Sequence, residues 1–234
     1  MDDIKKWIEA DMWFVDFLEK DKKFKETYDG QSFGSAYEVY VPASYGPENK
    51  YFVMEEKASG TNLTEWEKLK EEGHDMKDVV AIFIRFYLTQ MQNGQMHSDV
   101  HPGNFSITSD KKLVVYDRNF YLDISNEEKI LFMSLISKGA GLEQRSEKFL
   151  QYLTDGHDVS IKNLQKVKKN VESFVKALES QDSLTAQREL VAIKSSGIQV
   201  PLNFTLLLKN ISVLQGMAYK AGFKGLFEAL QYKS

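Results

Sequence analysis

The 234-residue chain contains no cysteine. This absence excludes a disulfide scaffold, thiol catalysis and cysteine-based zinc sites, and it fits a reducing compartment. Histidine and proline are also scarce, with four of each. Two of the histidines and one proline nevertheless fall within six residues, in the segment HSDVHP at 97–102. A segment that gathers such rare residues is the first place to look for a functional site.

Long apolar runs and an excess of basic residues are missing as well. Runs such as ILFMSLI at 130–136 fall far short of the roughly 20 residues that a membrane span requires. The N-terminal MDDIKKWIEADM places acids first and lacks the layout of a signal peptide. The net charge of −4 and the pI of about 5.7 argue against a nucleic-acid partner. We therefore expect a cytoplasmic protein without a transmembrane segment.

The composition is that of a globular chain, with 42% hydrophobic and 27% charged residues. Its length suits one large domain, or a domain with a smaller lobe. Apolar residues at helical spacing predict a helix over 2–20. The helix dipole favours the acidic residues at its N-terminal end. Strands are predicted within 36–46 and 50–56, and a wide apolar face predicts a central buried helix over 76–96.

The second half of the chain is predicted to be mainly helical. The strands thus cluster early and the helices late, which is typical of an α+β fold. His74 and His157 stand in polar, turn-like segments and are expected to be exposed. The later helices are predicted at about 126–137, 143–154, 159–180, 183–195 and 203–219.

The segment QMHSDVHPGNFSITSDKKLVVYDRNF, residues 95–120, has the spacing of a phosphoryl-transfer site. In kinases, a catalytic-loop aspartate accepts the substrate proton, and an asparagine five residues later binds magnesium. A second magnesium-binding aspartate follows a short hairpin. Here Asp99 and Asn104 have the first separation, and Asp117 follows thirteen residues later, after the strand-like LVVY. The pattern predicts Asp99 as the base and Asn104 and Asp117 as metal ligands.

Two other interpretations of this segment compete with a phosphoryl-transfer site. A polar loop with a Pro-Gly turn explains the turn itself but gives no reason for His97 and Asp99. A zinc site made of His97, Asp99 and His101 would place the two histidines on one helical face. The Pro-Gly that follows directly disfavours a helix there, and no further histidine is well placed to complete such a site.

The residues GQMHSDVHPGNFSI resemble the catalytic loop of the UbiB-type atypical kinases, also called aarF-domain kinases. IKKWIEADM resembles the helix that carries the family's ion-pairing glutamate, and VPASYGPENKYFVMEEKASGTNL resembles its strand, hinge and turn. GIQVPLNFTLLLKNISVLQG resembles the C-terminal signature of the family. The resemblance covers about residues 3–219, in the family's order.

The resemblance implies a protein-kinase-like fold of the α+β class. Residues 1–62 would form a reduced N-lobe of one helix and a few antiparallel strands, with the hinge strand at its end. Residues 63–234 would form a mainly helical C-lobe with the catalytic loop. ATP and Mg²⁺ would bind between the lobes, with His97 in the structural place of the kinase catalytic-loop histidine. The implied nucleotide-side residues are Glu9, as the ion-pairing glutamate, and Met54, Glu55 and Lys57, at the hinge.

The family is associated with isoprenoid-quinone biosynthesis and with ATP hydrolysis that drives lipid-linked work. The resemblance therefore implies a nucleotide partner, and an isoprenoid lipid or a membrane-associated biosynthetic complex as a further one. It also allows a location peripheral to a membrane. The helix at 203–219 is expected to pack under the C-lobe and away from the ATP site, in a supporting role.

The chain departs from the family pattern at two places. It shows no Lys-x-Gly-Gln motif, alanine-rich nucleotide loop or phosphate-contacting strand lysine, and Asp117 is followed by Arg-Asn instead of Phe-Gly. A pseudokinase that binds a nucleotide or a partner thus stays open beside an active kinase or ATPase. A small-molecule phosphotransferase of the aminoglycoside or fructosamine kinase type shares the loop pattern, but the C-terminal signature argues against it.

Overall fold

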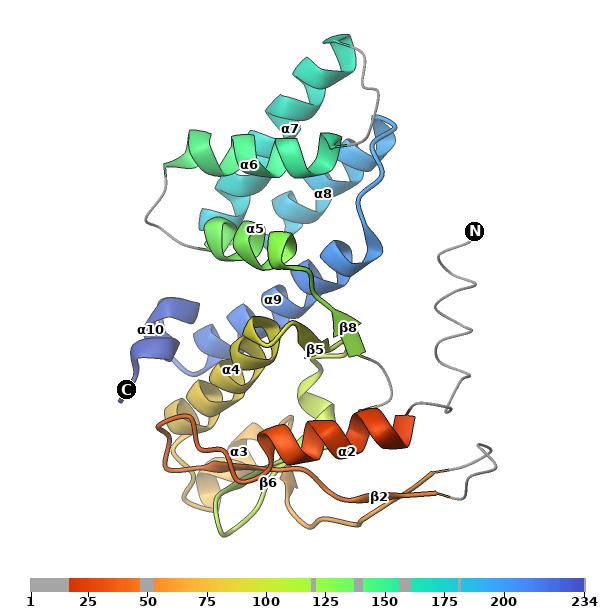
Figure 1. Cartoon of the computed structure of the whole chain (residues 1–234). Coiled ribbons are helices and arrows are strands. Elements are labelled where there is room, and N and C mark those ends of the chain that lie inside the picture. The colour runs from red at the N-terminus through yellow and green to blue at the C-terminus, as the bar shows by residue number, and fades with distance from the viewer. Residues whose placement is uncertain are drawn as a thin grey trace. The chain divides into compact units, whose positions relative to one another are not determined.

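The computed structural model describes residues 17–46, 53–118, 121–136, 141–155, 161–180 and 182–233 (Figure 1). The chain divides into two compact units. The first is Met1–Asp123 together with Leu207–Ser234, and the second is Ile124–Leu206. The predicted lobe boundary between residues 62 and 63 lies inside the first unit.

The first unit mixes short strands with helices. Its helices are α2 (Phe17–Tyr28), α3 (Trp66–Glu71), α4 (Met76–Gln92), most of α9 (Leu202–Lys220) and α10 (Leu226–Gln231). Its strands are β1 (Glu38–Tyr40), β2 (Ser44–Tyr45), β3 (Met54–Glu55), β4 (Thr61–Asn62), β5 (Gln95–His97), β6 (Phe105–Ile107), β7 (Lys112–Val115) and β8 (Tyr121–Asp123).

The strands form three small sheets. A four-stranded sheet has the order β1-β7-β6-β4, in which β1 runs parallel to β7 and the other neighbours are antiparallel. The antiparallel pairs β2-β3 and β5-β8 form the other two sheets. The strand-like run LVVY is confirmed as β7, which pairs with β6 in an antiparallel hairpin. This hairpin brings the residue before β6 and the residues after β7 to the same end.

Helix α4 is the central buried helix of the first unit. Asp75 caps its start by accepting a hydrogen bond from the backbone N–H of Lys77. Phe83, Phe86 and Tyr87 pack edge-on against Phe105 of β6, with ring centroids 4.9 to 6.5 Å apart. The core of the unit thus packs against β6, the strand that follows the HSDVHPGN loop.

Two of the predicted helix ends are wrong. The helix predicted over 76–96 ends at Gln92, because Gly94 has a φ of 84° and residues 95–97 pair with β8 as a strand. Residues 2–16 of the helix predicted over 2–20 lie outside the described residues. From there α2 continues past 20 to Tyr28, since Phe24 and Tyr28 extend its buried face.

The expectation that His74 is exposed is also wrong. Its ring is buried, and Nδ1 lies 3.0 Å from the hydroxyl of Tyr37, which is itself buried. The polar neighbours EEGHD concealed this packing at the level of the sequence. His157 lies outside the described residues.

The second unit is helical, as predicted. It contains α5 (Asn126–Ile136), α6 (Leu142–Thr154), α7 (Ile161–Ser180), α8 (Ser183–Ser195) and the first turn of α9. Phe149 of α6 packs on Phe174 of α7 and on Phe204 of α9, with ring centroids 5.1 and 4.9 Å away. The unit therefore has an aromatic core of its own.

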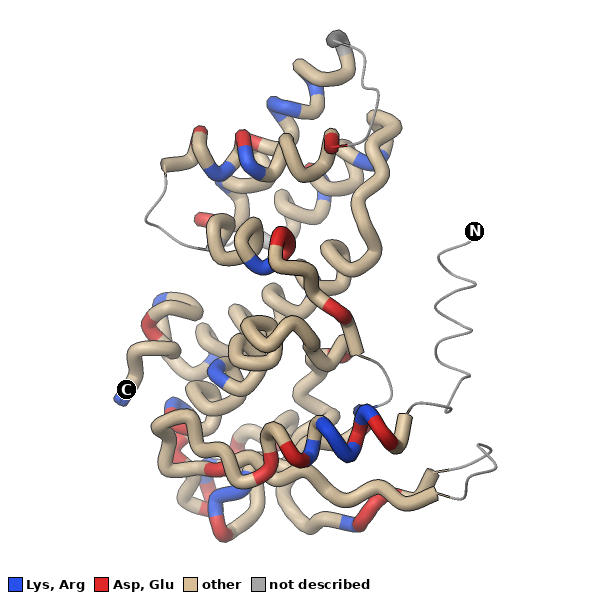
Figure 2. Tube along the Cα trace, in the orientation of Figure 1, with Lys and Arg blue, Asp and Glu red and all other residues tan. Residues whose placement is uncertain are grey.

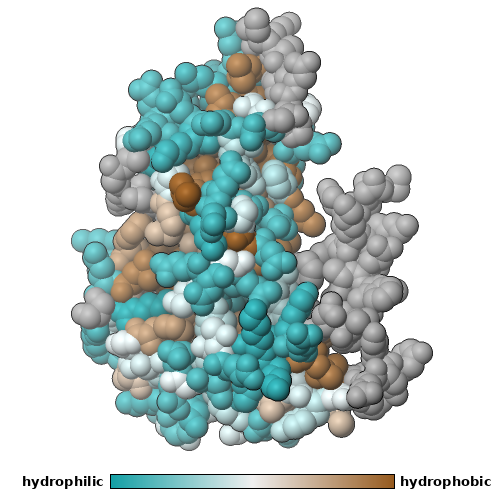
Figure 3. Space-filling model, in the orientation of Figure 1, coloured by the Kyte–Doolittle hydropathy of each residue, from teal (hydrophilic) through white to brown (hydrophobic). Residues whose placement is uncertain are grey.

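The surface carries charges of both signs. Figure 2 shows acidic and basic residues interspersed along α2. Figure 3 shows mainly hydrophilic residues on the face drawn, with hydrophobic residues in separate groups. Within the described ranges, every helix is either too short or too polar to serve as a membrane span.

Candidate active site

The loop between β5 and β6 is held in shape by its own polar groups. The backbone N–H of Gly103 donates to Nδ1 of His101 over 3.0 Å, which caps the short 3₁₀ turn at Pro102–Asn104. A Cβ at position 103 would lie 2.7 Å from that Nδ1, so a larger residue would displace the His101 ring. Asn62 of β4 donates from Nδ2 to the Gly103 carbonyl over 2.8 Å. These contacts fix Asn104 beside Asp99.

Asp99 is held by a hydrogen-bond donor at each carboxylate oxygen. Nδ2 of Asn104 donates to Oδ2 over 3.2 Å, and Nζ of Lys209 donates to Oδ1 over 2.9 Å. Partial burial tends to raise the pKa of Asp99, but the bonds from Lys209 and Asn104 outweigh it and hold the pKa below its ordinary value. Asp99 is thus an ionised carboxylate in a fixed orientation.

Lys209 was not predicted as a site residue. It belongs to α9, and the contact corrects the expectation that this helix lies away from the predicted site. The sequence does carry a signal, because Lys209 is the charged residue in the apolar run LLLKNISVL at 206–214. Nothing in the sequence alone pairs it with an aspartate 110 residues earlier.

His97 is a buried residue that hydrogen-bonds to the backbone of both Asp99 and Asp117. Its Nε2 donates to the Asp117 carbonyl over 2.7 Å, and its Nδ1 accepts the Asp99 backbone N–H over 3.2 Å. The ring is 1% exposed, and this burial lowers its pKa, so the neutral imidazole is favoured. With both nitrogens engaged by backbone groups, His97 positions Asp99 and Asp117.

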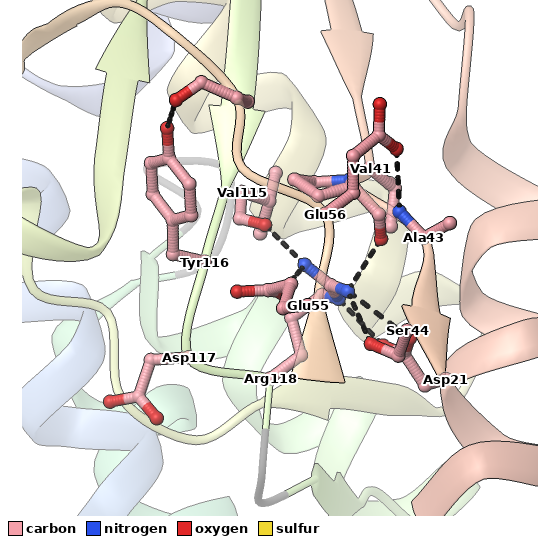
Figure 4. Close-up of polar contacts among 12 residues, drawn as sticks. Asp21, Val41, Ala43, Ser44, Glu55, Glu56, Val115, Tyr116, Asp117 and Arg118 are labelled. Carbon is pink, nitrogen blue, oxygen red and sulfur yellow. Dashed lines mark hydrogen bonds and ion pairs between the residues drawn. The ribbon is translucent and has the colours of Figure 1, made fainter. Parts of the chain in front are cut away.

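Asp117 follows β7 at the open end of the hairpin. The backbone N–H of Tyr116 donates to the Asn104 carbonyl over 2.8 Å, so the predicted ligands Asn104 and Asp117 come from adjoining positions. The φ of Asp117 is 51°, a left-handed conformation. In Figure 4 its carboxylate points away from the Arg118 guanidinium.

The donor chemistry of this pair fits magnesium. Mg²⁺ prefers oxygen ligands, typically one or two from the protein with the rest from water and phosphates. Asn104 uses its amide nitrogen on Asp99, which leaves the amide oxygen to act as a ligand. Asp117 supplies a carboxylate.

Arg118 occupies the place where the family usually has phenylalanine, and it is buried in an ion cluster (Figure 4). Its Nε and Nη2 donate to the two carboxylate oxygens of Asp21 over 2.6 and 3.1 Å. Nη1 lies 2.5 Å from Oε1 of Glu55, and Nη2 also donates to the Pro42 carbonyl over 2.8 Å. Burial lowers the pKa of the guanidinium, but the Asp21 pair outweighs it and raises the pKa overall.

The cluster ties the segment after Asp117 to α2 and to the β2-β3 hairpin. Glu55 belongs to it, and burial raises the pKa of its carboxyl although Arg118 partly opposes the rise. The departure from the family pattern at Arg118 is visible in the sequence, but its ion pairs with Asp21 and Glu55 were not predicted. A buried ion pair thus anchors the segment that follows Asp117.

The side chains of the predicted hinge residues differ in their contacts and exposure. Glu55 joins the Arg118 cluster through its side chain, whereas Met54 is 56% exposed and Lys57 is exposed. The Tyr116 hydroxyl donates to the Ala58 carbonyl over 3.2 Å and so connects the segment after the hinge to the site. The adenine-binding role of Met54, Glu55 and Lys57 stays a prediction. Glu9 lies outside the described residues.

The chain resembles proteins from plants and bacteria. Residues 2–148, more than half of the chain, match the model of the ABC1 atypical kinase-like domain. The Arabidopsis thaliana chloroplastic protein ACTIVITY OF BC1 COMPLEX KINASE 7 is 26% identical over 192 residues, 77% of this chain and 27% of the relative. A Clostridium pasteurianum protein described as uncharacterized is 23% identical over 227 residues, 87% of this chain and 39% of the relative.

The fold is also found in a solved structure. The complex of Rv3197 with erythromycin from Mycobacterium tuberculosis matches with a TM-score of 0.52 at 15% identity, covering 94% of this chain and 57% of that one. At this identity the match shows a shared fold alone. This chain spans only 27% and 39% of the lengths of the two curated relatives above. The family model matches residues 2–148 of this α+β, kinase-like chain. The chain therefore belongs to the ABC1 atypical kinase-like family, the group of the UbiB and AarF kinases.

Proposed function

We propose that the chain binds Mg-ATP through Asn104 and Asp117 and uses it, with Asp99 as the base, for ATP hydrolysis or phosphoryl transfer. The observation that carries the proposal is the convergence of these residues at one end of the β6-β7 hairpin. His97 joins the backbones of Asp99 and Asp117, and Asn104 bonds to the Asp99 side chain. These groups correspond to the base and the two metal ligands of a kinase-type phosphoryl-transfer site.

Each residue has a separate role in the proposal. Asn104 and Asp117 hold magnesium, which when bound neutralises charge on the phosphates. Asp99 orients the attacking hydroxyl or water and accepts its proton. A carboxylate with a lowered pKa is a weak base, but a loose phosphoryl-transfer transition state requires orientation more than basicity. His97 and Arg118 hold the two carboxylate-bearing segments in place.

The acceptor and partners are proposed on family resemblance alone. Water is the acceptor in an ATPase reaction, and an isoprenoid lipid or a membrane-associated biosynthetic complex is the proposed partner. The predicted lobe boundary and the hinge residues belong to the same proposal, with adenine lying against the backbone of residues 54–57.

The test is magnesium-dependent thermal stabilisation by ATP. A ligand at a hundred times its Kd stabilises the folded state by about 2.7 kcal/mol, which is a measurable shift in melting temperature. Asp117→Asn should abolish the magnesium-dependent part of this shift. The matched control is Asp110→Asn, an exposed aspartate in the turn between β6 and β7. If Asp117→Asn is stabilised as much as the wild type, the metal assignment is wrong.

Turnover separates an enzyme from a pseudokinase. Asp99→Asn should lower kcat strongly and change the Kd of Mg-ATP little, because Asp99 faces the acceptor and not the metal. A wild-type chain that binds Mg-ATP without measurable turnover would instead be a nucleotide-binding pseudokinase.

A further inference from the structure

Lys209 forms an ion pair with Asp99 that contributes little to the stability of the fold. Its Nζ lies 2.9 Å from Oδ1 of Asp99, while the side chains are 55% and 48% exposed. An exposed ion pair of this kind typically contributes between about 0 and 1 kcal/mol to stability. A cation from the C-terminal helix is therefore placed on the predicted catalytic carboxylate for little gain in folding free energy.

The backbone of α9 fixes where this lysine stands. The residues on either side of it, Leu208 and Asn210, are 8% and 1% exposed, and Leu207 and Ile211 are buried as well. Lys209 is the exposed position between them. Its ammonium therefore reaches the loop from an anchored segment of helix.

The ammonium is also accessible to a ligand. A lysine carries three N–H donors, and one of them is used on Asp99. The side chain of Lys209 is 55% exposed, and Asn104 bonds to the other oxygen of the same Asp99 carboxylate, so a ligand at this loop can reach the two remaining donors. Phosphate oxygens accept such charge-assisted hydrogen bonds readily.

We propose that Lys209 is a phosphate-binding residue of this site, which contacts the terminal phosphoryl group of a nucleoside triphosphate. The inference rests on the proposed function. In the transfer step, the acceptor oxygen bonds to the terminal phosphorus while the bond to the bridging β–γ oxygen breaks, and ADP leaves with that electron pair. The acceptor proton passes to Asp99. Lys209 keeps its protons and stabilises the charge on the equatorial oxygens.

The assignment predicts discrimination between tri- and diphosphates. A contact to the terminal phosphate is absent in ADP, so removing Lys209 should weaken Mg-ATP and leave Mg-ADP unchanged. One charged hydrogen bond corresponds to a loss of about ten- to a hundredfold in affinity.

The experiment measures Mg-ATP and Mg-ADP binding by calorimetry in the full chain. Lys209→Met should lose the affinity for ATP over ADP, and Lys209→Arg should retain part of it. Lys220→Met is the matched control on the same helix, since Lys220 lies over the Trp66 ring, 4.5 Å from its centroid. Melting temperatures confirm that each variant is folded.

A second pair of variants separates direct contact from an effect through Asp99. In the Asp99→Asn background, Lys209→Met should still weaken Mg-ATP if the lysine touches the phosphate. A loss seen only when Asp99 is present would overturn the inference, as would equal losses for ATP and ADP or none for either. A wild-type chain that binds neither nucleotide would overturn the proposed function itself.

Discussion

At the scale of the residue, His97 shows how burial selects a protonation state. Nε2 donates to one backbone carbonyl and Nδ1 accepts one backbone N–H. Only the neutral ring with its proton on Nε2 can make both bonds, because an imidazolium donates from both nitrogens. Protonation would break the bond to Asp99 and place a charge in the core.

The stability of the first unit should therefore depend on pH. Because the folded pKa of His97 is lowered from the ordinary 6.5, the unfolded chain binds the proton first as the pH falls. The free energy of unfolding should then decrease from about pH 6.5 down to the folded pKa. Denaturant unfolding across this range measures the slope. His97→Gln should flatten it, and an unchanged slope would show that His97 does not titrate between the two states.

Arg118 makes a second residue-scale prediction. Arg118→Met would leave Asp21, which is 2% exposed, as a buried charge without its partner. Breaking a buried pair in this way typically costs about 3–5 kcal/mol. Equilibrium unfolding in urea should show that loss, together with weaker magnesium-dependent ATP binding, because the segment after Asp117 loses its anchor.

Two control variants test the cause of this loss. The double variant Asp21→Leu with Arg118→Met should recover most of the stability, since apolar replacements of buried ion pairs are often neutral. Lys70→Met removes the exposed pair with Glu67 and should cost at most about 1 kcal/mol. A double variant as unstable as Arg118→Met alone would mean that lost packing, and not the unpaired charge, is responsible.

At the scale of the element, α9 combines support with a site residue. Leu207 is 2% exposed on its buried face. Leu207→Ala should cost about 2–5 kcal/mol, as buried leucine truncations typically do. The melting temperature should fall markedly, while the Mg-ATP affinity of the protein that remains folded stays the same.

The control for this variant is Ser212→Ala, an exposed position one turn further along α9 whose hydroxyl bonds to the Leu208 carbonyl. It should change stability by less than about 0.5 kcal/mol. If Leu207→Ala melted normally, the apolar face of α9 would not be a supporting surface.

The elements differ in how far the sequence predicts them. The helices α5 to α9 were predicted to within about two residues, because apolar periodicity and helical hydrogen bonds are local. The pairings β1-β7 and β5-β8 join residues far apart, and periodicity carries no information on such partners. Helix α10, six residues long, was not predicted, as short helices depend on tertiary packing.

The same distinction applies to the site. Asp99, Asn104 and Asp117 were found because their spacing along the chain is itself the signal. Lys209 and Arg118 act through partners that are distant in sequence, Asp99 and Asp21, so only the folded chain brings them together.

At the scale of the whole molecule, the chain forms two compact units. The described site residues lie in the first unit, while the second has its own aromatic core around Phe149. Arg145 and Glu179 form an ion pair within this unit. Cooperative folding regions often coincide with such units, so damage to one core need not reach the other.

The last prediction tests this independence. Phe149→Ala removes a ring that is fully buried between Phe174 and Phe204, and such truncations typically cost about 3–5 kcal/mol. Amide hydrogen exchange should then lose protection in α6, α7 and α8 while α4 and the β6-β7 hairpin stay protected. Val191→Ala, at a position 62% exposed on α8, is the control and should change neither. Equal loss of protection in α4 would mean that the two units unfold as one, so that mutations in the helical unit would affect the proposed nucleotide site through global stability.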